Sequence, residues 1–367
     1  MGKLKIAVYA ICKNEEQFVD GWMDSMQEAD MVIVADTGST DKTVAKLSAR
    51  GAVVNIVHVN PWRFDVARNI SLNFVPGDVD VCVCTDLDEI LEPGWRDKLE
   101  AVWTPQTTRL QYMYTWSFNP DGTRGVTFWY EKIHSRHGFR WNHPVHEILA
   151  YYGPEPDIYA WEPTIQLNHY PDPSKSRGNY LGLLELSVKE DPDDDRNMHY
   201  MGREYMFYGR WDECIATLKR HLEMPKAQWK DERAASMRFI ASAYLEKGDY
   251  EEATSWLYRA IAEAPYLREA YVELAKLAYS EQDWPTVYHM AEEVLLITDR
   301  TASYINEAYA WDATIYDLGA ISCYQLGMID RSYEWAKIAM EMSPDDERLK
   351  SNLEIIESSL DLIAPIE

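Results

Sequence analysis

The stretch VDVCVCTDLDE, residues 79–89, decides the fold because a buried strand ends there in a group of carboxylates. Its first half alternates apolar residues, many of them β-branched, which is typical of a β-strand. Asp86, Asp88 and Glu89 then follow within four residues. Carboxylates this close repel one another unless a cation lies between them. Because oxygen ligands suit Mg²⁺ or Mn²⁺, the stretch predicts a divalent-cation site at the carboxyl end of a strand.

Strand-like and helix-like segments alternate before this stretch. Strands are predicted over residues 4–11, 31–35, 53–59 and 79–85, and helices over 15–26, 41–50 and 64–74. Three β-α units that lead into a fourth strand predict an α/β fold, with a mostly parallel sheet and helices on both faces. Ser39 or Thr40 is expected to cap the helix at 41–50. Asn14, Asp36 and Asp86 each follow a strand, so they should converge at the edge where such sheets bind ligands.

Amphipathic helices replace the strand signals from about residue 180 onward. A turn signature recurs as YGRWDECI at 208–215, KGDYEEA at 247–253, QDW at 282–284 and GMID at 327–330. The second and third of these are 34 residues apart, the period of tetratricopeptide (TPR) helix pairs. We therefore expect four TPR-like helix pairs stacked into a curved surface. The proline-rich joint at 171–174 divides the chain into an α/β domain at 1–175 and an all-α domain at 176–367.

Composition narrows the possible classes of function. The net charge of −25, from 61 acidic and 36 basic residues, disfavours nonspecific binding to nucleic acid or to an anionic membrane. No apolar run reaches 18 residues, so no membrane span is expected. Five cysteines in no framework spacing indicate reduced thiols and a cytoplasmic protein. Cys82 and Cys84 share one face of their strand, and we interpret them as buried apolar residues in preference to half of a zinc site.

Four motifs in order carry a resemblance to a known family. They are ICKNEE at 11–16, DTGSTD at 36–41, ARN at 67–69 and TDLDE at 85–89. Together they resemble the successive signatures of family 2 glycosyltransferases of the GT-A fold, over about 170 residues. A GT-A domain followed by TPR-like helices is also similar in layout to bacterial peptide S-glycosyltransferases. Thr37 departs from the pattern, since many family members have a second aspartate there.

The resemblance implies a nucleotide-sugar donor, most often a UDP-sugar, and an acceptor that is a protein, a peptide or a glycan. The helical domain would bind the acceptor or form a homodimer. The positions that match the family's donor-binding residues are Ile11, Asn14, Glu15, Asp36, Arg68 and Asp86.

Asp86 and Asp88 would hold Mn²⁺ or Mg²⁺ on the donor's diphosphate. An inverting transfer needs a group that takes the acceptor's proton, and Glu147 is the candidate base because its place downstream of the metal strand resembles where the family has its catalytic acid residue. His169 is the candidate third metal ligand, with His146 as the alternative. An imidazole ligand would favour Mn²⁺ over Mg²⁺.

Residues 132–147, KIHSRHGFRWNHPVHE, contain four of the nine histidines, and we expect them to have a functional role rather than to form a plain surface hairpin. Trp62, Trp116, Trp129 and Trp141 are candidates for the acceptor pocket. Two other functions stay open. One is a helical-repeat interaction protein with an inactive GT-A domain. The other is a nucleotidyltransferase, although such enzymes usually have a glycine-rich loop where this chain reads CKNE at 12–15.

Overall fold

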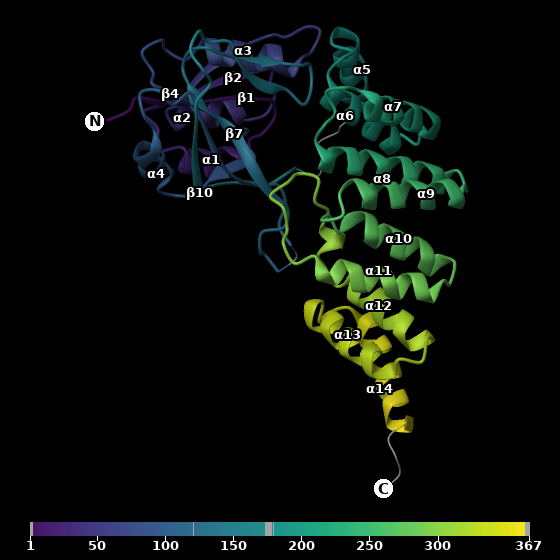
Figure 1. The fold of residues 1–367 in the computed structure, drawn as a ribbon. Helices are drawn as coiled ribbons and strands as arrows, with labels where there is room; N and C mark the ends of the chain where they lie inside the picture. Colours follow the sequence, from purple (N-terminus) through teal and green to yellow (C-terminus); the bar gives the residue numbers. More distant parts are fainter. Residues whose placement is uncertain (1–2, 120, 173–177, 179, 364–367) are drawn as a thin grey trace. The chain divides into compact units, whose positions relative to one another are not determined.

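The computed structural model describes residues 3–119, 121–172, 178 and 180–363, and Figure 1 shows its fold. The chain forms two compact units, Met1–Asp191 and Pro192–Glu367. The predicted joint at 171–174, and the boundary placed after residue 175, fall largely outside the described residues. Each unit is treated below by itself.

The first unit is built mainly of strands and short helices. Its strands are β1 (Ile6–Cys12), β2 (Met31–Asp36), β3 (Val53–Ile56), β4 (Val81–Cys84), β5 (Glu89–Leu91), β6 (Arg109–Thr115), β7 (Thr127–Ser135), β8 (Phe139–Asn142), β9 (Ile148–Tyr151) and β10 (Tyr159–His169). Its helices are α1 (Val19–Ser25), α2 (Thr43–Ala49), α3 (Phe64–Asn73), α4 (Trp95–Val102) and α5 (Tyr180–Glu190).

Eight of these strands form one sheet in the order β3-β2-β1-β4-β7-β6-β10-β5, and β8 pairs with β9 separately. β3, β2, β1 and β4 are parallel neighbours. β7 is antiparallel to both β4 and β6, and β5 is antiparallel to β10. The other six strands therefore run in one direction, which confirms the mostly parallel sheet.

Alternate residues of β1 face opposite sides of the sheet, as the period of two in a strand requires. Ile6, Val8 and Ala10 pack in a core with residues of α1, α2 and α4, including Trp22 and Trp95. Ala7 and Tyr9 pack on the other side, in a second core with Leu72 of α3, Trp141 of β8, and both Cys82 and Cys84. The prediction of helices on both faces is confirmed, and these two cysteines are buried free thiols as expected.

The two loops after β1 and β2 differ from the sequence-based prediction. The first helix begins at Val19 instead of residue 15, because the backbone of 14–16 bonds across to the other loop. The N–H groups of Asn14 and Glu15 donate to Ser39 Oγ (2.9 Å) and Thr43 Oγ1 (2.8 Å). The expected Ser39 or Thr40 cap of α2 is wrong, since no side-chain bond caps this helix at Lys42. Ser39 instead joins the two loops.

The second unit is a series of helices that follow one another along the ribbon of Figure 1. They are α6 (Asp195–Phe207), α7 (Trp211–Glu223), α8 (Lys230–Glu246), α9 (Tyr250–Glu263), α10 (Glu269–Ser280), α11 (Trp284–Leu296), the 3₁₀ turn η1 (Ala308–Ala310), α12 (Thr314–Gln325), α13 (Ile329–Met342) and α14 (Glu347–Ile363).

These helices pack as the pairs α6–α7, α8–α9, α10–α11 and α12–α13, with α14 against α13. The four predicted TPR-like pairs are thus confirmed, and α14 follows them. Among the described residues, no helix combines the length and the apolar character that crossing a membrane demands.

Candidate active site

The sheet register brings three of the motifs to one edge. Cys12 at the end of β1 lies opposite Asp36 at the end of β2, and Tyr9 of β1 lies opposite Cys84 of β4. The loops that follow these strands are therefore neighbours. α3 packs beside them, since its Ala67 shares a small apolar cluster with Ile11. This convergence is the one that the strand-end motifs predict.

The three carboxylates of residues 86–89 have different environments. Leu87 is fully buried in the core and anchors the turn. Glu89 is also buried, and it accepts hydrogen bonds from the Asp86 N–H (2.8 Å) and the Tyr114 hydroxyl (3.0 Å). Burial raises the pKa of Glu89. Glu89 therefore shapes the turn, while the Asp86 side chain remains about one-third exposed (31%) at the sheet edge.

Arg68 of α3 connects two of the predicted site residues. It is 4% exposed, and its guanidinium pairs with both carboxylate oxygens of Asp86, at 2.9 Å and 3.0 Å. The same guanidinium donates through Nε to Glu147. A buried, two-pronged pair of this kind is among the strongest polar contacts that proteins make. Arg68 thus holds Asp86 and Glu147, 61 residues apart in the chain, in one cluster.

The loop that carries Glu147 is fixed to α3 at two further points. Asn69 bonds the backbone of Trp141 through both ends of its amide, at 2.8 Å and 2.9 Å. The N–H of Phe64 donates to the carbonyl of Pro144 (2.9 Å). His143 and His146 in this loop adopt positive φ angles of 77° and 50°. Such backbone persists only where its surroundings hold it, and it is concentrated at functional sites.

Lys132 of β7 is a site residue that sequence reasoning did not single out. Its Nζ lies 3.6 Å from Asp86 and 3.8 Å from Glu89, and its side chain is 10% exposed. Burial opposes the charge of this amine, but Glu89, Tyr130 and Asp86 outweigh it and raise the pKa of Lys132. The signal that could have found it is a lysine in an otherwise aromatic and β-branched strand.

Asp88 and His169 form a second pair of predicted site residues at the sheet edge, next to the cluster around Arg68. His169 Nε2 lies 3.7 Å from Asp88 Oδ2, and the ring stacks on Trp116 with centroids 4.6 Å apart. Burial by itself lowers the pKa of His169, yet the Asp88 carboxylate raises it above the ordinary value. Trp116, a candidate for the acceptor pocket, is half exposed beside this histidine. Trp141, another candidate, is instead fully buried and donates to the Tyr9 hydroxyl.

The other predicted donor-binding residues lie at the ends of β1 and β2 and in the loop after β1. Asp36 is buried, and it accepts hydrogen bonds from the N–H groups of Gly38 and Ser39 (both 3.0 Å to Oδ2). Asn14, with φ of 53°, accepts from the Thr40 N–H (2.7 Å). Ile11 and Glu15 are buried at the end of β1 and just after it. Asn14 and Glu15 thus tie the loop after β1 to the segment after β2.

Residues 132–147 divide into site and scaffold. Lys132 and Glu147 lie in the Arg68 cluster. His134 is fully buried against the Tyr9 hydroxyl (2.9 Å), and burial lowers its pKa to about 3. His137 bonds the carbonyl of Gly77, and His146 lies edge-on to Tyr180 at 5.9 Å. The structure thus brings the two ends of the segment to the cluster around Arg68 and Asp86.

The predicted metal ligands offer donor atoms of a kind that divalent cations take, but among the described residues Asp86, Asp88 and His169 do not bring three ligand atoms within 4.8 Å of one another, and Asp86 pairs with Arg68. Asp86 and Asp88 offer carboxylate oxygens at a strand's carboxyl end, and His169 offers an imidazole next to Asp88. A donor set of two carboxylates and one imidazole suits Mn²⁺ better than Mg²⁺. The contact with Asp88 favours His169 over His146 as the third ligand.

Comparison with known proteins places the first unit in a family. Residues 7–145 match the family model described as Glycosyl transferase family 2. The chain therefore contains a family 2 glycosyltransferase domain, followed by a TPR-like helical domain. The matched range ends before Glu147 and His169, so their roles rest on geometry. No curated protein sequence matches the chain.

Several solved structures are similar to part of the chain. The MamA protein is 18% identical and shares 46% of this chain and 83% of its own, with a TM-score of 0.35. The APC/C hetero-tetramer Cut9-Hcn1 is 15% identical over 50% of this chain and 33% of its own (TM-score 0.39). A thermophilic TPR protein in Thermus thermophilus is 17% identical over 48% of this chain and 88% of its own (TM-score 0.34). These TM-scores are too low to support an argument, so the TPR-like assignment of the second unit rests on its own helix pairs.

Proposed function

We propose that the first unit transfers a sugar from a nucleotide-sugar donor, of the UDP-sugar class, to an acceptor, with inversion at the anomeric carbon. The family 2 domain supports a glycosyltransferase in general. The observation that carries the finer proposal is the buried Arg68, which joins Asp86 to Glu147. Arg68 contacts both a candidate metal ligand, Asp86, and the candidate base, Glu147.

Each residue of the cluster has a role in this proposal. Asp86, Asp88 and His169 would hold Mn²⁺, which when bound neutralises charge on the leaving diphosphate. Arg68 keeps Asp86 and Glu147 in position and adds positive charge where the diphosphate develops its negative charge. Glu147 takes the proton of the acceptor as the acceptor attacks the sugar.

The acceptor in this proposal is a protein, a peptide or a glycan. Trp116 offers a half-exposed aromatic ring next to His169, suited to stacking on a sugar. The TPR-like domain adds a long helical surface of a kind that binds peptides, and it could also form a homodimer.

Release of UDP from UDP-sugars, with Mn²⁺ present, tests the proposal. Glu147→Gln keeps the shape of the side chain but removes the base, so turnover should fall by about 10²–10⁴-fold. A UDP-sugar should still raise the melting temperature of this variant, because donor binding does not need the base. Chelation of the metal should also stop UDP release.

Glu155→Gln is the matched control, since Glu155 is exposed on the same unit. It should act as the wild type does. Wild-type turnover in Glu147→Gln would remove Glu147 from the mechanism. If the wild-type protein released no UDP from any nucleotide sugar, the chain would instead be an interaction protein with an inactive GT-A domain.

A further inference from the structure

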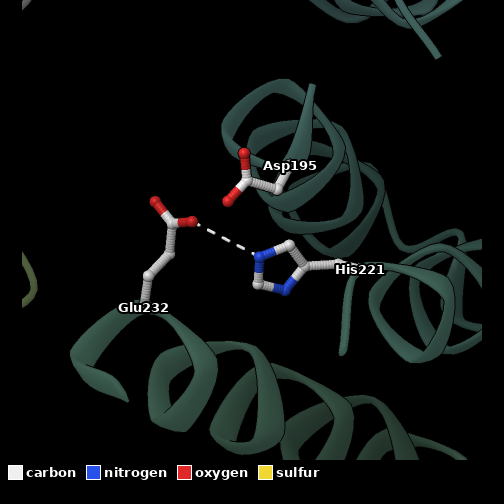
Figure 2. A group of neighbouring side chains, drawn as sticks. All are labelled: Asp195, His221 and Glu232. Atoms are coloured by element: carbon white, nitrogen blue, oxygen red, sulfur yellow. Dashed lines mark ion pairs between the residues drawn. The ribbon is translucent and has the colours of Figure 1, made fainter. Parts of the chain in front are cut away.

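A second group of possible metal ligands lies in the helical unit, away from any motif in the sequence. Asp195, His221 and Glu232 each offer one ligand atom, and these atoms all lie within 4.8 Å of one another (Figure 2). Asp195 begins α6, His221 lies in the last turn of α7, and Glu232 lies in the first turn of α8. Because α7 runs back between α6 and α8, these three helix ends meet.

The imidazole of His221 is directed into the space between the two carboxylates. Its side chain is fully buried, and that of Glu232 is 5% exposed. Nε2 lies 3.3 Å from Glu232 Oε1, an ion-pair distance, and among the described residues it makes no hydrogen bond of good geometry. Figure 2 shows this nitrogen on the side of the ring that faces Asp195 and Glu232. The nitrogen is thus positioned between two carboxylates and has room for a ligand to join them.

The number of protons available around Ser236 allows His221 Nε2 to be unprotonated and to carry a free lone pair. Ser236 Oγ lies between two imidazoles, 2.8 Å from His199 Nδ1 and 3.0 Å from His221 Nδ1. A hydroxyl has one proton, so it can donate to only one of the two rings. When it donates to His199, His221 must donate its own Nδ1–H to Ser236. A neutral His221 in this arrangement presents the lone pair of Nε2 to the carboxylates, and a bound metal cation would make that arrangement favourable.

The surroundings orient these side chains in the way that bound metals require. Ligating histidines usually bond through their other nitrogen, and ligating carboxylates are themselves hydrogen-bonded. His221 meets the first condition through Ser236, and Glu232 meets the second through the Tyr304 hydroxyl. Arg196 also acts electrostatically on Glu232.

Helix dipoles explain the three residues singly but not together. Acidic residues are favoured at the starts of α6 and α8, and a histidine at the end of α7. That preference is satisfied on the helix surface and does not require three ligand atoms to converge in a buried space.

We propose that Asp195, His221 and Glu232 bind a divalent transition-metal cation of the Zn²⁺ class. One imidazole and two carboxylates are Zn²⁺ ligands, and three protein ligands leave a fourth position for water on the partly exposed Asp195 side. The cation would fasten α6, α7 and α8 together at the start of the helical unit. This site is independent of the proposed transfer reaction.

Calorimetric titration of the metal-free full chain with Zn²⁺ tests the site, in a background of Asp86→Ala and Asp88→Ala that removes the candidate site of the first unit. We expect one Zn²⁺ per chain in this background. His221→Gln should weaken that binding at least tenfold, because it removes the only nitrogen ligand of the group. Co²⁺ in place of Zn²⁺ should give a visible absorption band that His221→Gln abolishes.

His289→Gln is the matched control, since His289 is exposed on α11 of the same unit. It should leave both signals unchanged. Asp195→Asn changes a partly exposed ligand at little risk to folding, and it should also weaken binding if His221→Gln fails to fold. Equal Zn²⁺ affinity in His221→Gln and His289→Gln, or in Asp195→Asn and the background, would overturn the proposal. The same holds if the background binds no Zn²⁺.

Discussion

The sheet edge of the first unit and the first three helices of the second unit both gather carboxylates from separate elements, but they balance the charge differently. At the sheet edge Arg68 pairs with Asp86 and Glu147, and Lys132 lies 3.6 Å from Asp86. In the helices Asp195 and Glu232 face the imidazole of His221.

The difference teaches what each site needs from a ligand. Guanidinium and ammonium groups are charged throughout the physiological pH range, so the sheet-edge cluster is assembled before any ligand arrives. A neutral imidazole adds no charge, so the helical group needs an added cation or a proton to balance its carboxylates. The sheet-edge carboxylates thus have permanent cationic partners, whereas those of the helical group do not.

The strongest way to break this comparison is to remove the central cation of the sheet edge. Arg68→Met leaves Asp86 and Glu147 close together without their shared partner. Breaking a buried ion pair from one side typically costs about 3–5 kcal/mol of folding free energy. We expect a loss of that size for the first unit in urea unfolding.

Arg140→Met is the control, because Arg140 is an exposed arginine of the same unit. Its free energy of unfolding should stay within about 0.5 kcal/mol of the wild type. If both variants unfolded alike, Arg68 would not be the group that balances the cluster.

A smaller effect is expected from the second cation. Lys132→Met removes an amine that lies 3.6 Å and 3.8 Å from Asp86 and Glu89, while Arg68 still pairs with Asp86. Leaving a buried polar group with one partner fewer costs about 1–3 kcal/mol. Urea unfolding measures this loss, with the exposed Lys42→Met as its control. A loss equal to that of Arg68→Met would mean that the two cations contribute equally.

Much of the sheet edge could be predicted from the sequence because it depends on local pattern. An alternating apolar run fixes a strand, the strand's end fixes the turn, and parallel neighbours bring Cys12 and Asp36 side by side. The ARN motif was also informative, since Arg68 and Asn69 both contact the loop around Glu147.

Contacts between distant segments could not be predicted in this way. β7 enters the sheet antiparallel beside β4, and only that pairing puts Lys132 next to Asp86. The start of α1 depended on Ser39 in another loop and on Thr43 at the start of α2. The helical group was missed altogether, because Asp195, His221 and Glu232 come from three helices and form no spacing motif.

The two aspartates of the sheet edge, Asp86 and Asp88, also differ in whether their partners are always charged. Asp86 faces groups that stay charged, whereas Asp88 faces His169, whose charge depends on pH. This contrast allows Asp88 to be tested without metal or substrate.

The pair of Asp88 and His169 should make the stability of the metal-free first unit depend on pH. Burial lowers the pKa of His169, but Asp88 and Glu89 outweigh it, so the folded state holds the proton more tightly than the unfolded chain. The pair's stabilising effect is therefore fully present below the unfolded pKa of about 6.5, and it is lost as pH rises through the higher folded pKa.

The measurement is the difference in unfolding free energy between the wild type and His169→Gln, at several pH values from about 5 to about 9, with Asp88→Asn as a second variant. Both differences should shrink as pH rises across that window, because the interaction ends when His169 loses its proton. His137→Gln is the control, since the His137 ring bonds a backbone carbonyl instead of a carboxylate. A difference that stayed constant with pH would contradict this, because it would mean that His169 binds its proton equally well in the folded and unfolded chain and gains nothing from Asp88.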